Sequence, residues 1–176
     1  MMWNRSYAKA MRHMKRPRKI REEFLRITNK DLIDNFRAAI NQHTPRLLKL
    51  YRAKRTALPP EMDQLLNRLD EEATDPEEEQ TKGLIVGILT VLEDDDSSAP
   101  ATVINVAVVV EENDIVLQDL PDMPVAFAYL FGLIYALNLQ YPKELRYTFE
   151  TIQKVFMELG TDLSATVRFF KNKLLQ

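Results

Sequence analysis

The sequence predicts an α+β fold: a small antiparallel sheet packed by two or three C-terminal helices and preceded by a basic helical segment. Two β-branched runs, at 84–92 and 102–110, have the composition of buried strands. Before and after them, apolar residues recur every three or four positions, which is the spacing of amphipathic helices. We therefore expect an α+β domain at 83–176.

The first 21 residues predict a basic N-terminal arm, because residues 1–21 contain eight Lys/Arg and no acid. No apolar run of secretory-signal length follows the basic residues, so a secretory signal is not expected. Four apolar residues fall at helical spacing until Pro17 interrupts the pattern: Trp3, Tyr7, Met11 and Met14.

Residues 22–69 predict a helical segment. Thr28 followed by Asp31 is typical of a helix start. Because the residue before a proline avoids the helical conformation, we expect a break near Asn41 and a second helix beginning at Pro45. The apolar face of the first helix has four members: Leu32, Ile33, Phe36 and Ile40. A further short helix is expected from Met62, Leu65, Leu66 and Leu69.

The net charge of −2 conceals an asymmetric distribution. Residues 1–55 hold 16 Lys/Arg and 4 Asp/Glu, whereas residues 56–100 hold 2 and 13. The stretch 70–82, DEEATDPEEEQTK, has few apolar groups to offset the entropy of ordering its backbone, so we expect an acidic linker. The basic and acidic segments can also pair with each other, which would weaken attraction for an outside partner.

The β-branched runs predict a meander of three strands. The polar stretch 93–100 separates the first two strands as a loop. A turn signal at 112–114 then allows Ile115 to Leu117 to return as a third, short strand. An antiparallel arrangement is the simplest one for these connections.

The stretch from Met123 to Pro142 has no charged side chain, so it is either a membrane span or the centre of a core. A span needs about 20 mostly apolar residues. The clearly apolar part, 125–139, is shorter and contains Asn138. Strands precede it and an amphipathic helix follows, so we expect a buried central helix and no membrane contact.

Three small residues lie at i, i+4 and i+8 on this central helix: Ala128, Gly132 and Ala136. Such a stripe lets another backbone approach closely. The favoured interpretation is internal close packing against the sheet or a neighbouring helix, and a dimer interface is the alternative.

Two more helices are predicted after the central one. Pro142 suits a helix start and Gly160 suits its C-terminal stop. Thr161 or Asp162 can then cap a last helix. The first stripe consists of Leu145, Phe149, Ile152, Phe156 and Leu159, and the second of Leu163, Val167, Phe170 and Leu174.

The residue types present predict no catalytic, metal or cofactor site. The chain has no cysteine, and neither His13 nor His43 stands in a metal-binding motif. The four glycines form no dinucleotide or phosphate loop. Residues 93–96 are consecutive carboxylates without the alternate spacing and glycine of a calcium loop. We therefore expect a protein that is not an enzyme and uses no cofactor.

The best short functional signal is a basic cluster whose members are Lys15, Arg16, Arg18 and Lys19. Nuclear import receptors and phosphates both recognise such stretches. A simply solvated tail and a mitochondrial presequence remain alternatives for the same residues.

Several segments of the sequence resemble segments of a known group of proteins. They are KGLIVGILTVLED, INVAVVVEE and AYLFGLIYALNLQYPKELRYTFETIQKVFMELG, with ITNKDLIDNFRAAINQHTPRLLKLYRAKR upstream. The regions that they span, about two thirds of the chain, resemble the C-terminal region of large animal proteins labelled sterile alpha motif domain-containing protein-like. The most specific of these segments is LFGLIYALNLQYPKEL.

The sterile alpha motif itself is not recognisable, so the resemblance implies neither that motif's function nor catalytic residues. The abrupt join at LDEEATDPEEEQ suggests a shortened member, in which the helices at 22–55 would lack packing partners.

Together these patterns predict a non-catalytic, intracellular protein-interaction module, with self-association as one open alternative. Its protein partner is not named by the sequence, and the basic cluster favours the nucleus as its location. The alternative is a nucleic-acid-binding protein that uses the basic residues of 5–55.

Overall fold

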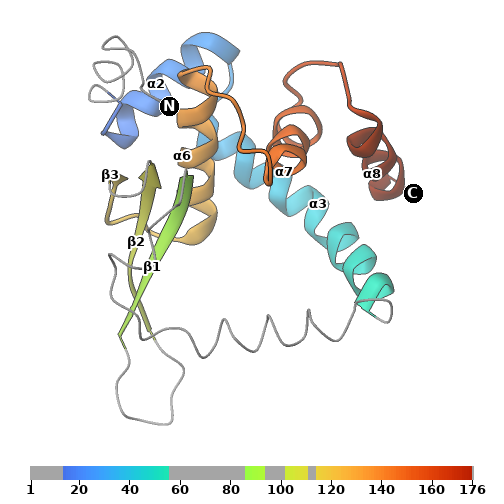
Figure 1. Cartoon of the computed structure of the whole chain (residues 1–176), viewed down its shortest axis with the longest axis horizontal. Coiled ribbons are helices and arrows are strands. Elements are labelled where there is room, and N and C mark those ends of the chain that lie inside the picture. Colours follow the sequence, from blue (N-terminus) through green and yellow to red (C-terminus); the bar gives the residue numbers. More distant parts are fainter. Residues whose placement is uncertain (1–13, 56–85, 94–101, 111–113, 176) are drawn as a thin grey trace.

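The computed structural model describes residues 14–55, 86–93, 102–110 and 114–175. Within these residues the architecture is α+β, as the sequence predicts (Figure 1). A three-stranded antiparallel sheet lies on one side of the central helix α6, α2 and α3 pack on its other sides, and α8 lies further out against α3 and α7. The acidic linker at 70–82 and the short helix expected from Met62 to Leu69 lie outside the described residues.

Helix α2 (Pro17–Thr28) begins earlier than the sequence suggests. Trp3, Tyr7 and Met11 of the apolar stripe expected before Pro17 lie outside the described residues. Pro17 itself occupies the first helical position, where a missing N–H removes no hydrogen bond. The helix ends at Asn29, which is left-handed with φ 56°. The basic arm predicted at 1–21 therefore passes into α2, and Ile20 is fully buried.

Asp31, and not Thr28, caps the next helix, α3 (Leu32–Arg55). The Asp31 carboxylate accepts hydrogen bonds from the backbone N–H groups of Ile33 and Asp34, each at 3.0 Å. The Thr28 hydroxyl donates instead to the carbonyl of Phe24, at 2.7 Å, within the preceding helix.

The predicted break near Asn41 is wrong, because α3 continues through Pro45 for 24 residues. Pro45 cannot donate a hydrogen bond to the preceding turn, a loss that costs about 3 kcal/mol in a helix interior. Tertiary packing on both sides of the proline offsets this cost. Phe36 lies in the main core, and Leu47 and Leu50 pack in a second cluster.

The predicted meander is confirmed. Strands β1 (Val86–Glu93), β2 (Thr102–Val110) and β3 (Asp114–Leu117) pair antiparallel in the order β1-β2-β3. Ile88 lies opposite Val108, and the β1–β2 register shifts only between Val91 and Leu92.

Helix α6 (Met123–Ala136) is the buried central helix that the uncharged stretch predicts. The carboxylate of Asp122 caps it by accepting the backbone N–H of Val125 at 2.7 Å. The helix ends three residues before the predicted limit, where Asn138 takes φ 51° and redirects the chain. None of the helices in the described ranges has both the length and the apolar character that a bilayer crossing requires.

The N-terminal helices share the core of the C-terminal half. Phe24 of α2 is fully buried, and its ring centroid lies 6.0 Å from that of Phe131 and 5.5 Å from that of Tyr135 on α6. Lys30 also donates a hydrogen bond of 2.8 Å to the carbonyl of Met157, which is 127 positions further along the chain. The helices at 22–55 therefore have their packing partners within this chain.

The C-terminal helices depart from their predicted limits. Helix α7 (Arg146–Thr151) begins four residues after Pro142 and continues into a π-helix, η1 (Ile152–Phe156). The Met157 N–H bonds to the Ile152 carbonyl at 2.8 Å, which widens the last turn and ends the helix before Gly160. Helix α8 (Ala165–Leu175) follows.

Candidate interaction surface

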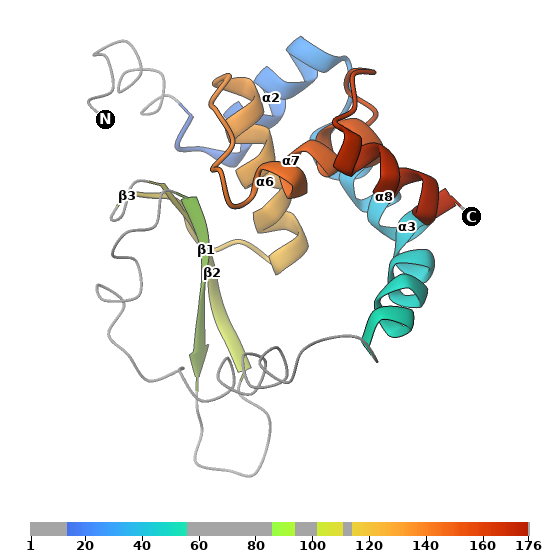
Figure 2. The same cartoon turned by 45° about the vertical axis from the view of Figure 1, so that its right-hand side comes forward.

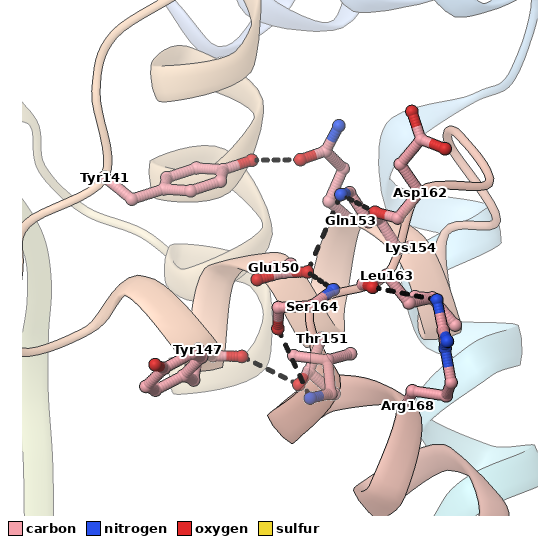
Figure 3. A network of polar contacts seen from close by, with 11 residues as sticks. Tyr141, Tyr147, Glu150, Thr151, Gln153, Lys154, Asp162, Leu163, Ser164 and Arg168 are labelled. Carbon is pink, nitrogen blue, oxygen red and sulfur yellow. Dashed lines mark hydrogen bonds and ion pairs between the residues drawn. The ribbon is translucent and has the colours of Figure 1, made fainter.

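A polar network fixes the start of α8 against α7 and η1 (Figure 3). Glu150 is only 7% exposed. Its carboxylate accepts a hydrogen bond from the backbone N–H of Ser164 at 2.7 Å. Lys154 Nζ lies 3.6 Å from the same carboxylate and donates to the carbonyl of Asp162. Burial opposes ionisation, but the hydrogen bonds from Ser164 and the charge of Lys154 lower the pKa of Glu150, so it is a carboxylate at neutral pH.

The cap of α8 is also set by this network. Ser164 Oγ accepts the backbone N–H of Val167 at 3.4 Å, whereas the sequence predicts Thr161 or Asp162 in this role. The hydrogen bond from the backbone N–H of Ser164 to the carboxylate of Glu150 selects Ser164, because it orients the chain before the helix begins.

An apolar cluster then holds α8 against α3. Val167 and Leu174 of α8 are buried with Val155 of η1, and Leu47 and Leu50 of α3 pack against them. Next to this cluster, the imidazole of His43 stacks on the ring of Phe156, with 4.9 Å between centroids. Two segments more than 100 residues apart in sequence thus lie side by side (Figures 1 and 2).

The two helices in contact carry cations without acids. After Asp34, α3 contains six Lys/Arg and no Asp/Glu, and α8 contains three Lys/Arg and no Asp/Glu. Among the described cations of α3 and α8, Arg37 alone forms an ion pair with a described acid, Asp122, at 3.3 Å. We define the basic helix pair as Arg46, Lys49, Arg168, Lys171 and Lys173.

Exposed apolar side chains accompany these cations on the same helices. Leu48 is 46% exposed, Phe169 62% and Leu175 49%. Lys173 Nζ lies 4.5 Å from the centroid of the Phe169 ring, within the range of a cation–π contact. Of these residues, Phe169 and the two arginines belong to types that are enriched at protein interfaces, whereas lysine is depleted there.

The basic cluster that the sequence singles out is placed at the start of α2. Arg16 directly precedes the helix, beside the half-buried Lys15. Arg18 and Lys19 lie 3.4 Å and 2.8 Å from the same carboxylate, that of Glu22. The adjacent cleft of about 420 Å³ is lined by two arginines, Arg18 and Arg21, and two acids, Glu22 and Asp31. Glu22 therefore offsets part of the positive charge of this cluster, whereas no described acid pairs with the basic helix pair.

The small-residue stripe on α6 is occupied from within the chain. A Cβ atom added at Gly132 would lie 2.4 Å from Leu32 Cδ2 and 3.1 Å from Ile20 Cγ2. Ala128 is 1% exposed and Ala136 is half-buried. The close approach that the stripe allows is used by α2 and α3, and a second chain could reach Gly132 only by displacing them.

A cleft of about 410 Å³ lies at the C-terminal end of α6, and both polar and apolar residues line it. Asn138, Tyr141 and Gln153 line it together with apolar residues, and the Tyr141 hydroxyl donates to Gln153 Oε1 at 3.0 Å. Burial raises the pKa of Tyr141. The described residues that line the cleft include no carboxylate, imidazole or amine.

The described ranges contain no group of three His, Cys, Asp or Glu that could hold a metal ion. No family model, curated protein or solved structure matches the chain. The family resemblance described above therefore stays a prediction.

Proposed function

We propose that the protein is a non-catalytic interaction module that binds an acidic segment of another protein through the basic helix pair. This proposal rests on one observation. All charged residues of α8, and those of α3 after Asp34, are Lys or Arg, and the two helices lie in contact. Exposed Leu48 and Phe169 add apolar contact area beside those cations. Complementary charge steers an acidic partner to such a surface and fixes its orientation.

Binding of a fluorescein-labelled poly-glutamate peptide, followed by fluorescence anisotropy, tests the proposal. The double variant Arg168→Gln/Lys173→Gln should weaken binding by about 1.5- to 5-fold for each exposed cation removed. The control Lys143→Gln/Arg146→Gln removes the same charge from two exposed residues outside the basic helix pair, one in the turn before α7 and one at the start of that helix. Equal losses in both variants would show that only net charge matters, and would contradict the proposal.

Nucleic-acid binding is the second candidate, and the exposed ring of Phe169 beside Lys173 favours it. Proteins that bind single strands combine cations with aromatic rings on which bases stack. A labelled single-stranded oligonucleotide should then bind with a steep salt dependence, and each lost phosphate contact should reduce the salt slope by about 0.7. Phe169→Ala should weaken this binding while leaving the affinity for poly-glutamate less affected. If the oligonucleotide does not bind at low salt, this candidate is excluded.

A further inference from the structure

The outer edge of β1 is unpaired within the described part of the chain, because β1 ends the sheet order β1-β2-β3. An edge strand presents a row of backbone N–H and C=O groups to any other strand. Proteins usually protect such edges with lysine, proline or a bulge. β1 contains neither lysine nor proline, and its pairing with β2 is regular from Val86 to Val91.

The two faces of β1 differ in what they contact. Val86 and Ile88 belong to the core beneath α6, and the hydroxyl of Thr90 contacts Met123 Sδ at 3.2 Å. Since successive side chains alternate between faces, Gly87 and Leu89 point away from α6. The strand contains no charged residue from Val86 to Leu92, and its residues from Gly87 to Val91 are partly exposed.

We propose that β1 of a second copy of the chain pairs antiparallel with this edge, centred on Leu89, to form a six-stranded sheet across a two-fold axis. In this register Leu89 lies opposite its own copy. The flanking pairs are Ile88 with Thr90, Gly87 with Val91, and Val86 with Leu92, so no charge opposes a like charge.

The faces of the strand restrict the register. A shift by one residue would place a side chain that faces α6 opposite one that faces away, which antiparallel pairing does not allow. Among the remaining registers, the one centred on Leu89 uses the whole uncharged part of the strand, from Val86 to Leu92. The axis stands perpendicular to the sheet, so both α6 helices cover the same face. The interface is thus self-complementary, as a two-fold dimer requires.

Light scattering coupled to size-exclusion chromatography measures the first consequence on the whole chain. Wild type should elute at twice the 20.5 kDa monomer mass. Leu89→Lys and Leu89→Glu should each give the monomer mass, because like charges then face each other at the axis. Mixing the two variants should restore the dimer, because lysine then faces glutamate. A monomeric wild type, or two variants that stay dimeric, would overturn the proposal.

Cysteine crosslinking gives an independent readout that does not depend on charged variants folding. The chain has no cysteine, so Leu89→Cys introduces a single thiol opposite its own copy. Mild oxidation should convert it to a disulfide-linked dimer. Val91→Cys is the matched control, on the same strand and face, but its two copies lie roughly 13 Å apart in this register, beyond disulfide reach. Crosslinking of Val91→Cys that equals or exceeds that of Leu89→Cys would exclude this register.

Discussion

Single residues decide how closely α2 and α3 approach α6, and Gly132 is the tightest point. Alanine at this position gains about 1 kcal/mol of helix stability. Its methyl group, however, would meet the fully buried side chain of Leu32 at 2.4 Å. We expect Gly132→Ala to lower the free energy of unfolding by about 1–3 kcal/mol, as overpacking does, measured by urea denaturation.

A double-mutant cycle provides the control for this prediction. Leu32→Ala removes the atoms that the new methyl group meets, so Gly132→Ala should cost less in that background. The same cost in both backgrounds would show that the strain lies elsewhere. If Gly132→Ala instead reduced the mass of a native oligomer without loss of stability, the dimer interpretation of the stripe would be favoured.

His43 couples stability to pH. The residue is 6% exposed, and its Nδ1 atom has no hydrogen-bond partner in the described structure. Burial, and to a smaller extent the charge of Arg46, lower its pKa below the ordinary 6.5, although Glu158 opposes this. Below about pH 6.5 the unfolded chain takes up a proton that the folded chain resists, so stability is full above this pH and falls as the pH drops.

Chemical denaturation between pH 7.5 and 5.5 should therefore show a loss of stability in wild type that His43→Phe lacks. Phenylalanine preserves the stack on Phe156 but cannot titrate. Asp31 and Glu150, whose pKa values are also lowered, contribute losses at more acidic pH in both proteins. Parallel curves for the two proteins would contradict the role of His43.

At the scale of elements, α3 carries a proline that its packing tolerates. Pro45→Ala restores a backbone N–H in the helix interior, which is worth about 3 kcal/mol. The freer unfolded chain takes back about 1 kcal/mol. We expect a net gain of about 1–2 kcal/mol by urea denaturation. Pro17→Ala is the control, because proline at a first helical position removes no hydrogen bond and little change should follow.

The elements themselves could be predicted from the sequence, but several of their ends could not. Composition and periodicity identify all three strands, α6 and the apolar stripe of α8, because burial alone determines those patterns. The ends depend on distant partners. Ser164 caps α8 because Glu150 binds its N–H, and α3 passes Pro45 because α6 and α8 hold both of its halves. No local pattern contains that information.

At the scale of the whole molecule, the N-terminal helices and the sheet should unfold together. Phe24 is fully buried between α2 and α6, and Phe24→Ala should cost about 3–5 kcal/mol. Hydrogen exchange measured by mass spectrometry should show faster exchange in β2 as well as in α2. Loss of protection confined to α2 would mean that the domain predicted at 83–176 is stable by itself.

The candidate surface shows the limit of sequence reasoning at this scale. The basic character of residues 5–55 is visible in the sequence, and the absence of acids from 165–175 is visible too. Their proximity is not, because it arises only when α8 packs on α3 beside η1. In the best short functional signal, Lys15 to Lys19, two of the cations form ion pairs with Glu22.

The hydrogen bond between Lys30 and the carbonyl of Met157 has a consequence for biosynthesis. A ribosome releases α2 and α3 long before it has made the segments that cover them, since α6 begins at Met123 and α8 at Ala165. At about 5–20 residues per second, the nascent chain displays two amphipathic helices without a core for several seconds. The main core can close only after Met157 and Leu159 have left the exit tunnel, and until then the apolar faces of α2 and α3 have no partner to cover them.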